Sequence, residues 1–512
     1  MTNKFQILDC TLRDGGYYTD WDFAPGVVNT YLDAVNKLPI DYIEVGYRNN
    51  PDKTYMGEYG YCPVSSLRRI RKRCTKKIAV MINEKSSRVE DLPYLVFPIE
   101  GLVDMVRIAV DPKNIDRAIN LAKHIKEAGF EVGFNLMYMS KWTEYEGLFP
   151  KLAELNGVVT LLNMVDSFGS MMPDDVAETI SVIRKYTDCP LGFHGHNNLQ
   201  LALINTLTAI KCGVISVDGT ILGMGRGAGN LNIELLLTCL NRQGLEVDFN
   251  VLGDAISAYM PLWHQYNWGT MLPYMISGAN SIPQKEVMAW CTNRAYSFNS
   301  IVRAVDNKRS HVADNAHFGT LKADHYDDVL IVGGGTSTSD HIEAIKEFIS
   351  QHPRMAIVFA TTRHAADLKE VMNDKFFVLV GNEARRMEKT VPEAEFNGIC
   401  VLSPYPRKMG TEVPSYANNE TYELEKISFT GDYEDSCTTV ALQTAIELTP
   451  ENIYIVGYDG YRGQVLSDKE MELSSENRTL FSQFEKFTAK QLISLTPSLY
   501  RSLHVKSIYQ YL

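Results

Sequence analysis

The sequence predicts an α/β protein with an N-terminal TIM (β/α)8 barrel and a C-terminal Rossmann-like parallel α/β domain. The chain has 512 residues, more than one ordinary domain contains. Eight short β-rich runs precede residue 221, and segments with apolar residues at helical spacing separate them. Eight such units fit a closed barrel. A doubly wound open sheet is the alternative, but it usually stops at roughly five to seven strands.

The eight runs define the expected barrel strands, and the segments between them define the helices. The segment 114–130 is typical, because Ile115, Ile119 and Ala122 fall on one helical stripe and Gly129 follows as a C-terminal cap. The barrel with its C-terminal helices is expected over residues 1–315. The expected strands are 4–10, 42–47, 77–83, 105–110, 131–137, 159–166, 191–196 and 215–220.

Composition and charge restrict the class of protein. The formal net charge of -12 argues against a nucleic-acid or anionic-membrane partner. Apolar runs stay shorter than the ~18 residues that a membrane-spanning helix requires. The N-terminus "MTNKFQILDC" does not read as a signal peptide, and the nine cysteines form no CxxC pair. A cytoplasmic protein with reduced thiols is therefore expected.

Polar residues follow or close most of the expected strands. In a (β/α)8 barrel the carboxyl ends of the strands carry the chemistry. We therefore expect these side chains to meet at one rim of the barrel. They are Asp14, Glu44, Arg107, Asn135, Asp166, His194, His196 and Asp218.

The motif "GFHGHNN" gives the clearest chemical signal. His194 and His196 are two residues apart on a strand, so both side chains point to one face. Two imidazoles with a carboxylate from another strand form a divalent metal site, and Asp14 is the expected carboxylate. The alternative is a pair of core histidines that bond to backbone carbonyls.

Two glycine-containing segments flank this predicted site. In "RDGG", Gly15 and Gly16 are expected to let the chain turn beside the substrate. "GMGRGAGN", residues 223–230, follows the last strand and either holds an anion or forms a tight turn. Asn230 either caps the next helix or serves as a fourth metal ligand.

Five motifs in order resemble the DRE-TIM metallolyase superfamily. They are "LDCTLRDGG", "IEVGY", "DSFGSMMP", "GFHGHNNLQLALINTLTAI" and "VDGTILGMGRGAGNLNIE". The resemblance spans about residues 5–240, with helices to about residue 310. It implies a TIM barrel that binds Mn²⁺ or Mg²⁺ through Asp14, His194 and His196, with Asn230 nearby. It also implies that Arg13 and Glu44 complete the trio that names the superfamily.

Within this superfamily the chain is most similar to 4-hydroxy-2-oxovalerate aldolases. The loop after the last strand contains no cysteine, unlike the CoA-ester lyases, and "RDGGY" replaces the RDGEQ of the synthases. Tyr17 stands where the aldolase carries its acid/base histidine. Tyr18 or a metal-bound water are alternative proton carriers, and both tyrosines could instead pack over the barrel mouth. A Claisen-type acyl-CoA synthase and a non-catalytic scaffold are the alternative functions.

The resemblance implies an aldolase that joins or cleaves a 2-oxo acid, such as pyruvate, and an aldehyde. Arg13 is expected to face the enolate, and Glu44 to orient Arg13. The expected substrate is a small molecule, and the barrel family often forms homodimers. Residues expected to line or support the substrate site are Arg107, Asn135, Asp166 and Gly227.

Residues 325–512 predict a second domain beyond a polar boundary region. "DVLIVGGGTSTSDHIEAIKEFI" predicts strand, glycine-rich turn and helix, and further strands give a sheet of about five. The segment loosely resembles the DUF115 family and bacterial sialyltransferase-like Rossmann proteins, with their GxGPSL motif altered to "GGGTSTS". This implies a nucleotide or nucleotide-sugar site, and a bifunctional protein with a C-terminal transferase is one alternative. The other alternative is a docking module in which the glycines form a tight packing turn. The candidate contacts are Gly334, Thr336, Ser337 and Asp459.

Overall fold

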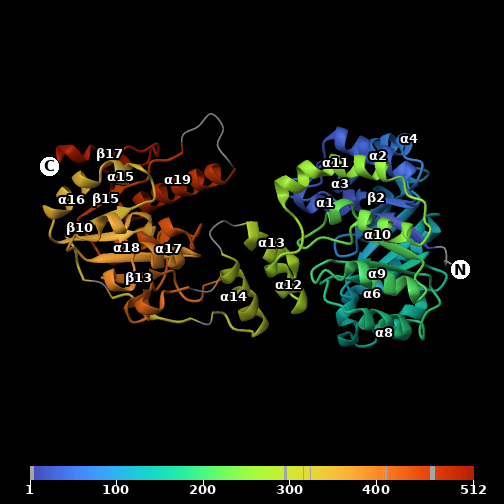
Figure 1. Cartoon of the computed structure of the whole chain (residues 1–512). Coiled ribbons are helices and arrows are strands. Elements are labelled where there is room, and N and C mark those ends of the chain that lie inside the picture. Colours follow the sequence, from blue (N-terminus) through green and yellow to red (C-terminus); the bar gives the residue numbers. More distant parts are fainter. Residues whose placement is uncertain are drawn as a thin grey trace. The chain divides into compact units, whose positions relative to one another are not determined.

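The computed structural model describes residues 5–292, 297–314, 316–322, 324–407, 409, 412–461 and 468–512 (Figure 1). The chain divides into two compact units, Met1–Ala289 and Trp290–Leu512. The division falls within helix α13 (Gln284–Thr292), and helix α14 (Phe298–Arg309) lies in the second unit. Within the described residues, no helix is long and apolar enough to cross a membrane.

The first unit contains a closed barrel of eight parallel strands in sequential order. All eight predicted strands are confirmed, and the open-sheet alternative is excluded because β1 also pairs with β8. The strands are β1 (Gln6–Asp9), β2 (Tyr42–Tyr47), β3 (Lys77–Asn83), β4 (Met105–Val110), β5 (Glu131–Leu136), β6 (Leu161–Asp166), β7 (Leu191–Gly195) and β8 (Ser216–Gly219).

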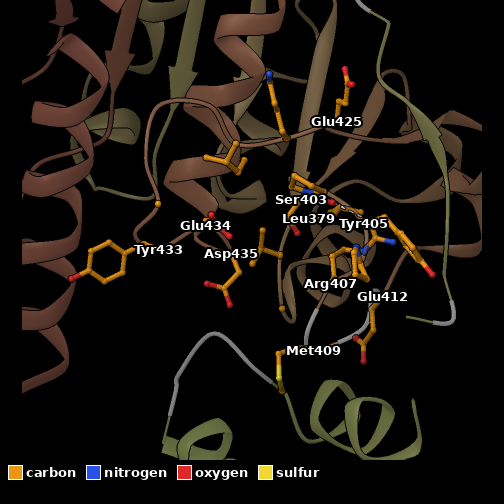
Figure 2. Close-up of a pocket in the computed structure, with 17 residues that line it drawn as sticks. Leu379, Ser403, Tyr405, Arg407, Met409, Glu412, Glu425, Tyr433, Glu434 and Asp435 are labelled. Atoms are coloured by element: carbon orange, nitrogen blue, oxygen red, sulfur yellow. Dashed lines mark hydrogen bonds between the residues drawn. The ribbon is translucent and has the colours of Figure 1, made fainter. Parts of the chain in front are cut away.

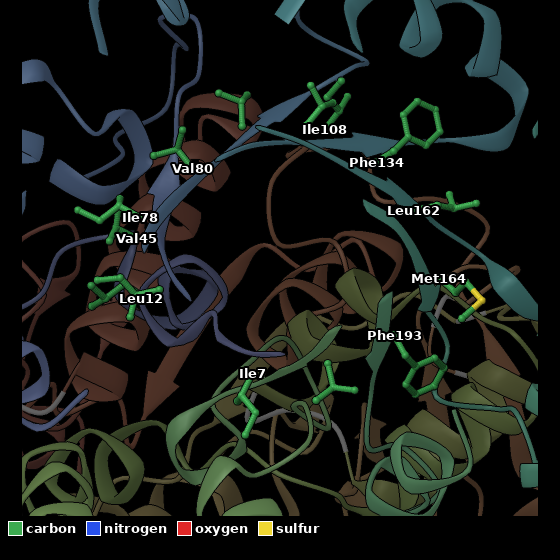
Figure 3. Close-up of a cluster of buried hydrophobic side chains, with 14 of the residues drawn as sticks. Ile7, Leu12, Val45, Ile78, Val80, Ile108, Phe134, Leu162, Met164 and Phe193 are labelled. Carbon is green, nitrogen blue, oxygen red and sulfur yellow. The ribbon is translucent and has the colours of Figure 1, made fainter. Parts of the chain in front are cut away.

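Helices surround the barrel and cover the outward-facing strand residues. Figure 3 shows such residues from several strands, including Val80, Ile108 and Phe134, all completely buried. The predicted stripe of the helix after β4 is buried, and Gly129 adopts the expected positive φ of 87°. The helices of eight or more residues after the first are α2 (Pro25–Lys37), α4 (Val64–Arg73), α6 (Ile115–Glu127), α8 (Pro173–Ile183), α9 (Ala202–Lys211), α10 (Ile233–Asn241), α11 (Phe249–Tyr266), α12 (Leu272–Ala279) and α13 (Gln284–Thr292).

Strand alternation selects the residues that point into the barrel. Neighbours such as Ile43 and Val45 pack in the outer core, so Glu44 between them faces inward. Leu8, Cys10, Tyr42, Ala79 and Met105 form a separate apolar cluster. The same alternation directs Arg107, Asn135, His194 and Asp218 inward, since their strand neighbours belong to the outer core.

The segment after β1 is a helix, α1 (Thr11–Thr19), so the predicted turn at Gly15 and Gly16 is wrong. Both glycines lie within this helix, where the lack of a side chain lets neighbouring side chains pack closely against the backbone. A Cβ on Gly16 would lie 2.0 Å from the Trp21 ring, and one on Gly15 would lie 2.6 Å from Met224 Sδ. The indole of Trp21 also donates a 2.9 Å hydrogen bond to the carbonyl of Arg13.

The second unit contains a nine-stranded sheet whose described pairings are all parallel. Its order is β17-β16-β15-β10-β11-β12-β13-β14-β9. The sheet therefore has more strands than the predicted five, because short strands extend both edges. The strands are β9 (Gly319–Thr320), β10 (Asp328–Val332), β11 (Met355–Phe359), β12 (Lys375–Leu379), β13 (Ile399–Leu402), β14 (Thr421–Glu423), β15 (Asn452–Val456), β16 (Leu492–Ser494) and β17 (His504–Val505).

Two hydrophobic clusters pack in this unit. One contains Val440 and Phe481, from α18 (Cys437–Glu447) and α19 (Asp468–Thr488). The other contains Phe348, from α16 (Ile342–Ser350), and Met387, from α17 (Glu383–Thr390). Strand residues alternate between the two clusters, as in β10, so helices cover both faces of the sheet. The strand order changes direction between β10 and β15.

Candidate metal and active site

The two histidines close β7 and present the same ring atom to the barrel mouth. His194 Nδ1 lies 2.9 Å from Asp218 Oδ2, and His196 Nδ1 lies 2.8 Å from the carbonyl of Asp166. These acceptors fix the Nδ1–H tautomer, which leaves Nε2 of each ring as the lone-pair donor. Burial, and then the neighbouring His194, lower the pKa of His196 to about 3, so its imidazole is neutral.

Asp14 supplies the carboxylate beside these rings. Its Oδ2 lies 3.7 Å from His194 Nε2 and accepts a 2.7 Å hydrogen bond from Asn230 Nδ2. Its Oδ1 accepts from Arg13. Although burial opposes ionisation, Arg13 and the two histidines hold the pKa of Asp14 below its usual value. Asp14 is therefore an ionised ligand candidate.

A buried ion network lies around Glu44. Arg13 Nε donates to Glu44 Oε2 at 2.8 Å, and Arg107 Nη1 donates to the same oxygen at 3.0 Å. Arg107 also donates to Asp218, and its Nε donates to Asn135 Oδ1 at 3.1 Å. Burial opposes ionisation of Asp218, but Arg107 and His194 hold its pKa at about 2.

Arg107 and Asn135, which were predicted to line or support the substrate site, belong to this network. Arg107 is completely buried and directs its donors to protein acceptors, and Asn135 Oδ1 also accepts from Asn163 Nδ2 at 3.1 Å. Both residues therefore contact the buried ion network.

Asp166 fixes a loop and orients a histidine. Its carboxylate accepts backbone N–H groups of Ser170 and Met171, both at 3.2 Å, while its carbonyl accepts from His196. Burial raises the pKa of Asp166 to about 6, and these amides oppose the increase.

The loop of residues 223–230 holds Asn230 against Asp14. A Cβ on Gly225 would lie 2.6 Å from Asn230 Nδ2, so glycine makes room for that side chain. Gly227 has a φ of 65°, and its carbonyl accepts a 3.2 Å hydrogen bond from the Tyr18 hydroxyl. Backbone N–H groups of the loop, such as that of Asn230, donate to carbonyls of the chain. The tight-turn interpretation therefore accounts for the glycines.

Aromatic residues cover the mouth of the site. The Tyr17 hydroxyl lies 3.2 Å from the hydroxyl of Tyr47, which closes β2 and is buried. Burial raises the pKa of Tyr47 well above its usual value, so Tyr47 is protonated near neutral pH. The Arg226 guanidinium carbon lies 5.0 Å from the Tyr17 ring centroid. Tyr47 lies in the motif "IEVGY" and Arg226 in "GMGRGAGN", but the sequence alone assigned neither of them a role, because their contacts depend on the fold.

The site offers a ligand set that fits a divalent cation. Asn230 Oδ1 is buried and accepts no hydrogen bond from the described residues, so this oxygen is available. The neutral Nε2 atoms of the histidines and the Asp14 carboxylate complete a nitrogen and oxygen set, which suits Mn²⁺ or Mg²⁺. Ligand atoms of Cys10, His194 and Asp218 also lie within 4.8 Å of one another. Burial raises the pKa of the Cys10 thiol well above its usual value, however, and Asp218 is already bonded to His194 and Arg107.

Among the described residues of the second unit, two cavities lie at the carboxyl ends of the strands. One, of about 400 Å³, lies beyond β10, β11 and β15, where the strand order changes direction. The other, of about 500 Å³, lies beyond β12, β13 and β14, and is lined by charged and aromatic residues such as Arg407, Glu412 and Tyr433 (Figure 2).

Three of the four predicted nucleotide residues, Gly334, Thr336 and Asp459, line the cavity of about 400 Å³. Ser337 binds Asp459 through its hydroxyl and through its N–H at 3.0 Å. The N–H groups of Gly333 and Gly335 donate to backbone carbonyls beyond β15 or at its end. The glycine-rich loop therefore holds Asp459 in place, and few of its amides remain for a phosphate.

Comparisons with known proteins match the barrel. The HMGL-like family model matches residues 105–256. A 4-hydroxy-2-oxovalerate aldolase of Pelotomaculum thermopropionicum is 32% identical over 266 residues, which cover 51% of this chain and 77% of that protein. An oxaloacetate decarboxylase of Mycobacterium tuberculosis is 28% identical, covering 58% of this chain and 89% of that protein.

A solved structure also matches part of the chain. The N-terminal domain of a putative aldolase from Bacteroides vulgatus is 62% identical, with a TM-score of 0.56. The match covers 58% of this chain and 99% of that domain.

Proposed function

Because the chain belongs to the HMGL-like family of DRE-TIM metallolyases, we propose that it is a divalent-metal-dependent aldolase acting on pyruvate, or a close 2-oxo acid, and an aldehyde. Asp14, His194, His196 and Asn230 would hold Mn²⁺ or Mg²⁺. When bound, the cation supplies a Lewis acid for the carboxylate and carbonyl oxygens of the 2-oxo acid.

The position of the Arg13 guanidinium is the main observation that supports this proposal. Its Nε and Nη1 are held by Glu44 and Asp14, whereas its Nη2 donates to none of the described residues. A guanidinium fixed on two sides with one free donor suits a negative charge that develops on the enolate oxygen. Glu44 and Arg107 keep the guanidinium in place, because both belong to the same buried ion network.

The tyrosine pair supplies a route for the proton. In the addition direction, C3 of pyruvate loses a proton and bonds to the aldehyde carbon, and the resulting alkoxide takes up a proton. In cleavage the same steps run in reverse. We propose that the Tyr17 hydroxyl moves this proton, with the Tyr47 hydroxyl as its hydrogen-bond partner.

Proton exchange at the methyl group of pyruvate tests the function without knowledge of the aldehyde. Purified protein is incubated in heavy water with pyruvate and Mn²⁺ or Mg²⁺, and loss of the methyl signal is followed by NMR. We expect metal-dependent exchange that His194→Ala and His196→Ala abolish. Absence of exchange, together with thiol release from acetyl-CoA and a 2-oxo acid, would establish the Claisen-type synthase instead.

We propose, as a second function, that the second unit binds a nucleotide or a nucleotide sugar, which would link the aldolase to sugar or surface-glycan biosynthesis. The supporting observation is the cavity of about 400 Å³ at the point where the strand order changes, which is the usual ligand position in open parallel sheets. Asp459 and Arg363 both line this cavity, and we propose that Asp459 accepts ribose or sugar hydroxyls and that Arg363 contacts phosphate.

Calorimetry with UDP, CMP and UDP-glucose tests this second function. Saturable binding that Asp459→Ala weakens is the expected result. An absence of binding for all three ligands would leave the second unit as a docking module.

A further inference from the structure

Arg226 is placed at the mouth of the barrel site by the loop that also holds Asn230. It lies between β8 and α10, four residues before Asn230. The N–H of Gly229 donates a 3.2 Å hydrogen bond to the Arg226 carbonyl, which closes the loop. The Arg226 guanidinium stacks near the Tyr17 ring at 5.0 Å, within the range of a cation–π contact.

The guanidinium of Arg226 has no acidic partner in the described part of the chain. It forms no ion pair and no hydrogen bond there, and its Nε is fully buried without an acceptor. A buried guanidinium N–H without a partner is energetically costly, so an acceptor is expected from beyond the described residues, such as a bound ligand.

The charge of the site leaves Arg226 as a surplus cation. Arg13 and Arg107 face the carboxylates of Asp14, Glu44 and Asp218, so this network has one negative charge in excess. A divalent cation and the carboxylate of a 2-oxo acid together supply one positive charge, which balances that excess. The charge of Arg226 is then balanced only by a further anion.

We propose that Arg226 binds an anionic group, a carboxylate or a phosphate ester, on the acceptor aldehyde. The proposal rests on the aldolase function given above. Arg13 and the metal ligands surround the position of the 2-oxo acid, so Arg226 on the loop beyond them is left for the second substrate. The planar guanidinium suits both anions, because each offers two oxygens to its fork of donors.

Specificity constants for four aldehydes test this proposal. Succinic semialdehyde carries a carboxylate and glyceraldehyde 3-phosphate a phosphate ester, whereas propanal and glyceraldehyde are neutral. Pyruvate consumption is followed for the full-length protein loaded with Mn²⁺. We expect one anionic aldehyde to be preferred, and Arg226→Ala to lower its kcat/KM by about 10- to 100-fold, since a hydrogen-bonded charge pair is lost. The kcat/KM of the neutral aldehydes should change by less than about threefold.

Two further variants serve as controls for the effect of Arg226→Ala. Arg226→Lys retains the charge without the fork and should give an intermediate loss, and it replaces Arg226→Ala if that variant does not fold. Arg68→Ala removes an exposed arginine from α4 and should leave all four constants unchanged.

The outcomes separate this proposal from the proposed function. Equal losses for anionic and neutral aldehydes, or a wild-type protein without preference for either anion, would overturn the role of Arg226. Failure of wild-type pyruvate exchange would instead refute the aldolase itself. The better of the two anionic aldehydes identifies the anion as carboxylate or phosphate.

Discussion

At the scale of single residues, the site is a chain of buried charges in which each group fixes the next. Arg107 contacts Glu44 and Asp218, Glu44 holds Arg13, and Asp218 orients His194. The sequence motifs identified most of these residues because their types and positions at strand ends suggest chemistry. The assignment of each residue required burial and distance, which a single sequence does not contain.

Replacement of Arg13 should separate turnover from metal binding. Arg13→Ala removes the donor aimed at the enolate, so pyruvate exchange should fall by about 10²- to 10³-fold. The metal ligands themselves remain, so Mn²⁺ affinity measured by calorimetry should change far less. Arg13→Lys keeps the charge but loses the fork and serves as the control. Undiminished exchange in Arg13→Ala would contradict the role.

Replacement of Arg107 should affect stability before chemistry. Arg107→Met removes the arginine partner of Asp218 and leaves Arg13 as the arginine that pairs with Glu44, inside a fully buried network. Breaking such a pair typically costs about 3–5 kcal/mol, so urea unfolding of the barrel should shift by this amount. A stability loss below about 1 kcal/mol would show that Arg107 does not compensate these carboxylates.

Asp9 should make the barrel less stable as pH rises toward neutrality. It is completely buried at the end of β1, and burial raises its pKa from 3.8 to about 6, although Tyr31 and Thr11 donate to it. Because the folded-state pKa is raised, its stabilising contribution is complete below pH 3.8 and is lost as pH rises through about 6.

The expected loss is roughly 3 kcal/mol between pH 4 and 7. Unfolding of wild type and Asp9→Asn is compared across this range by the fluorescence of barrel tryptophans such as Trp142. The stability of the variant relative to wild type should rise with pH. A constant difference across the range would refute this assignment.

At the scale of elements, α1 shows where sequence patterns mislead. Two consecutive glycines predicted a turn, yet Gly15 and Gly16 lie within a helix. Met224 and Trp21 occupy the space that side chains at these two positions would need. Tertiary packing overrides the low helix propensity of glycine here. By contrast, the barrel strands were predictable because most of them have a run of β-branched and apolar residues.

An added methyl group should test this packing. Gly16→Ala places a Cβ 2.0 Å from the Trp21 ring and should destabilise the barrel by about 1–3 kcal/mol. Gly26→Ala in α2 is the matched control, because no atom lies within 4 Å of its added Cβ. This control should be neutral or stabilising by up to about 1 kcal/mol. Equal effects of both changes in thermal unfolding would contradict the packing role.

At the scale of the whole molecule, the chain consists of two units that each bury their own core. The sequence predicted both sheets but not their full extent. Strands such as β9 and β17 have two residues each, too few to show a period-2 pattern. The two units divide within α13, where no glycine or proline marks a boundary in the sequence.

The barrel unit should function alone. A truncated chain of residues 1–292 contains all the proposed metal ligands and ends with α13. We expect it to fold and to catalyse metal-dependent pyruvate exchange at a rate similar to that of the full chain. The related N-terminal domain from Bacteroides vulgatus supports this expectation. A folded but inactive fragment would show that the second unit contributes to the chemistry.

The short outer strands of the second sheet have a consequence for solubility at high concentration. Any open sheet exposes unpaired N–H and C=O groups at its two borders, where a foreign strand can attach and start aggregation. Here each border consists of two residues, Gly319–Thr320 or His504–Val505, all exposed. A border this short offers an incoming strand very few backbone hydrogen bonds, so a nine-stranded parallel sheet is protected from lateral growth.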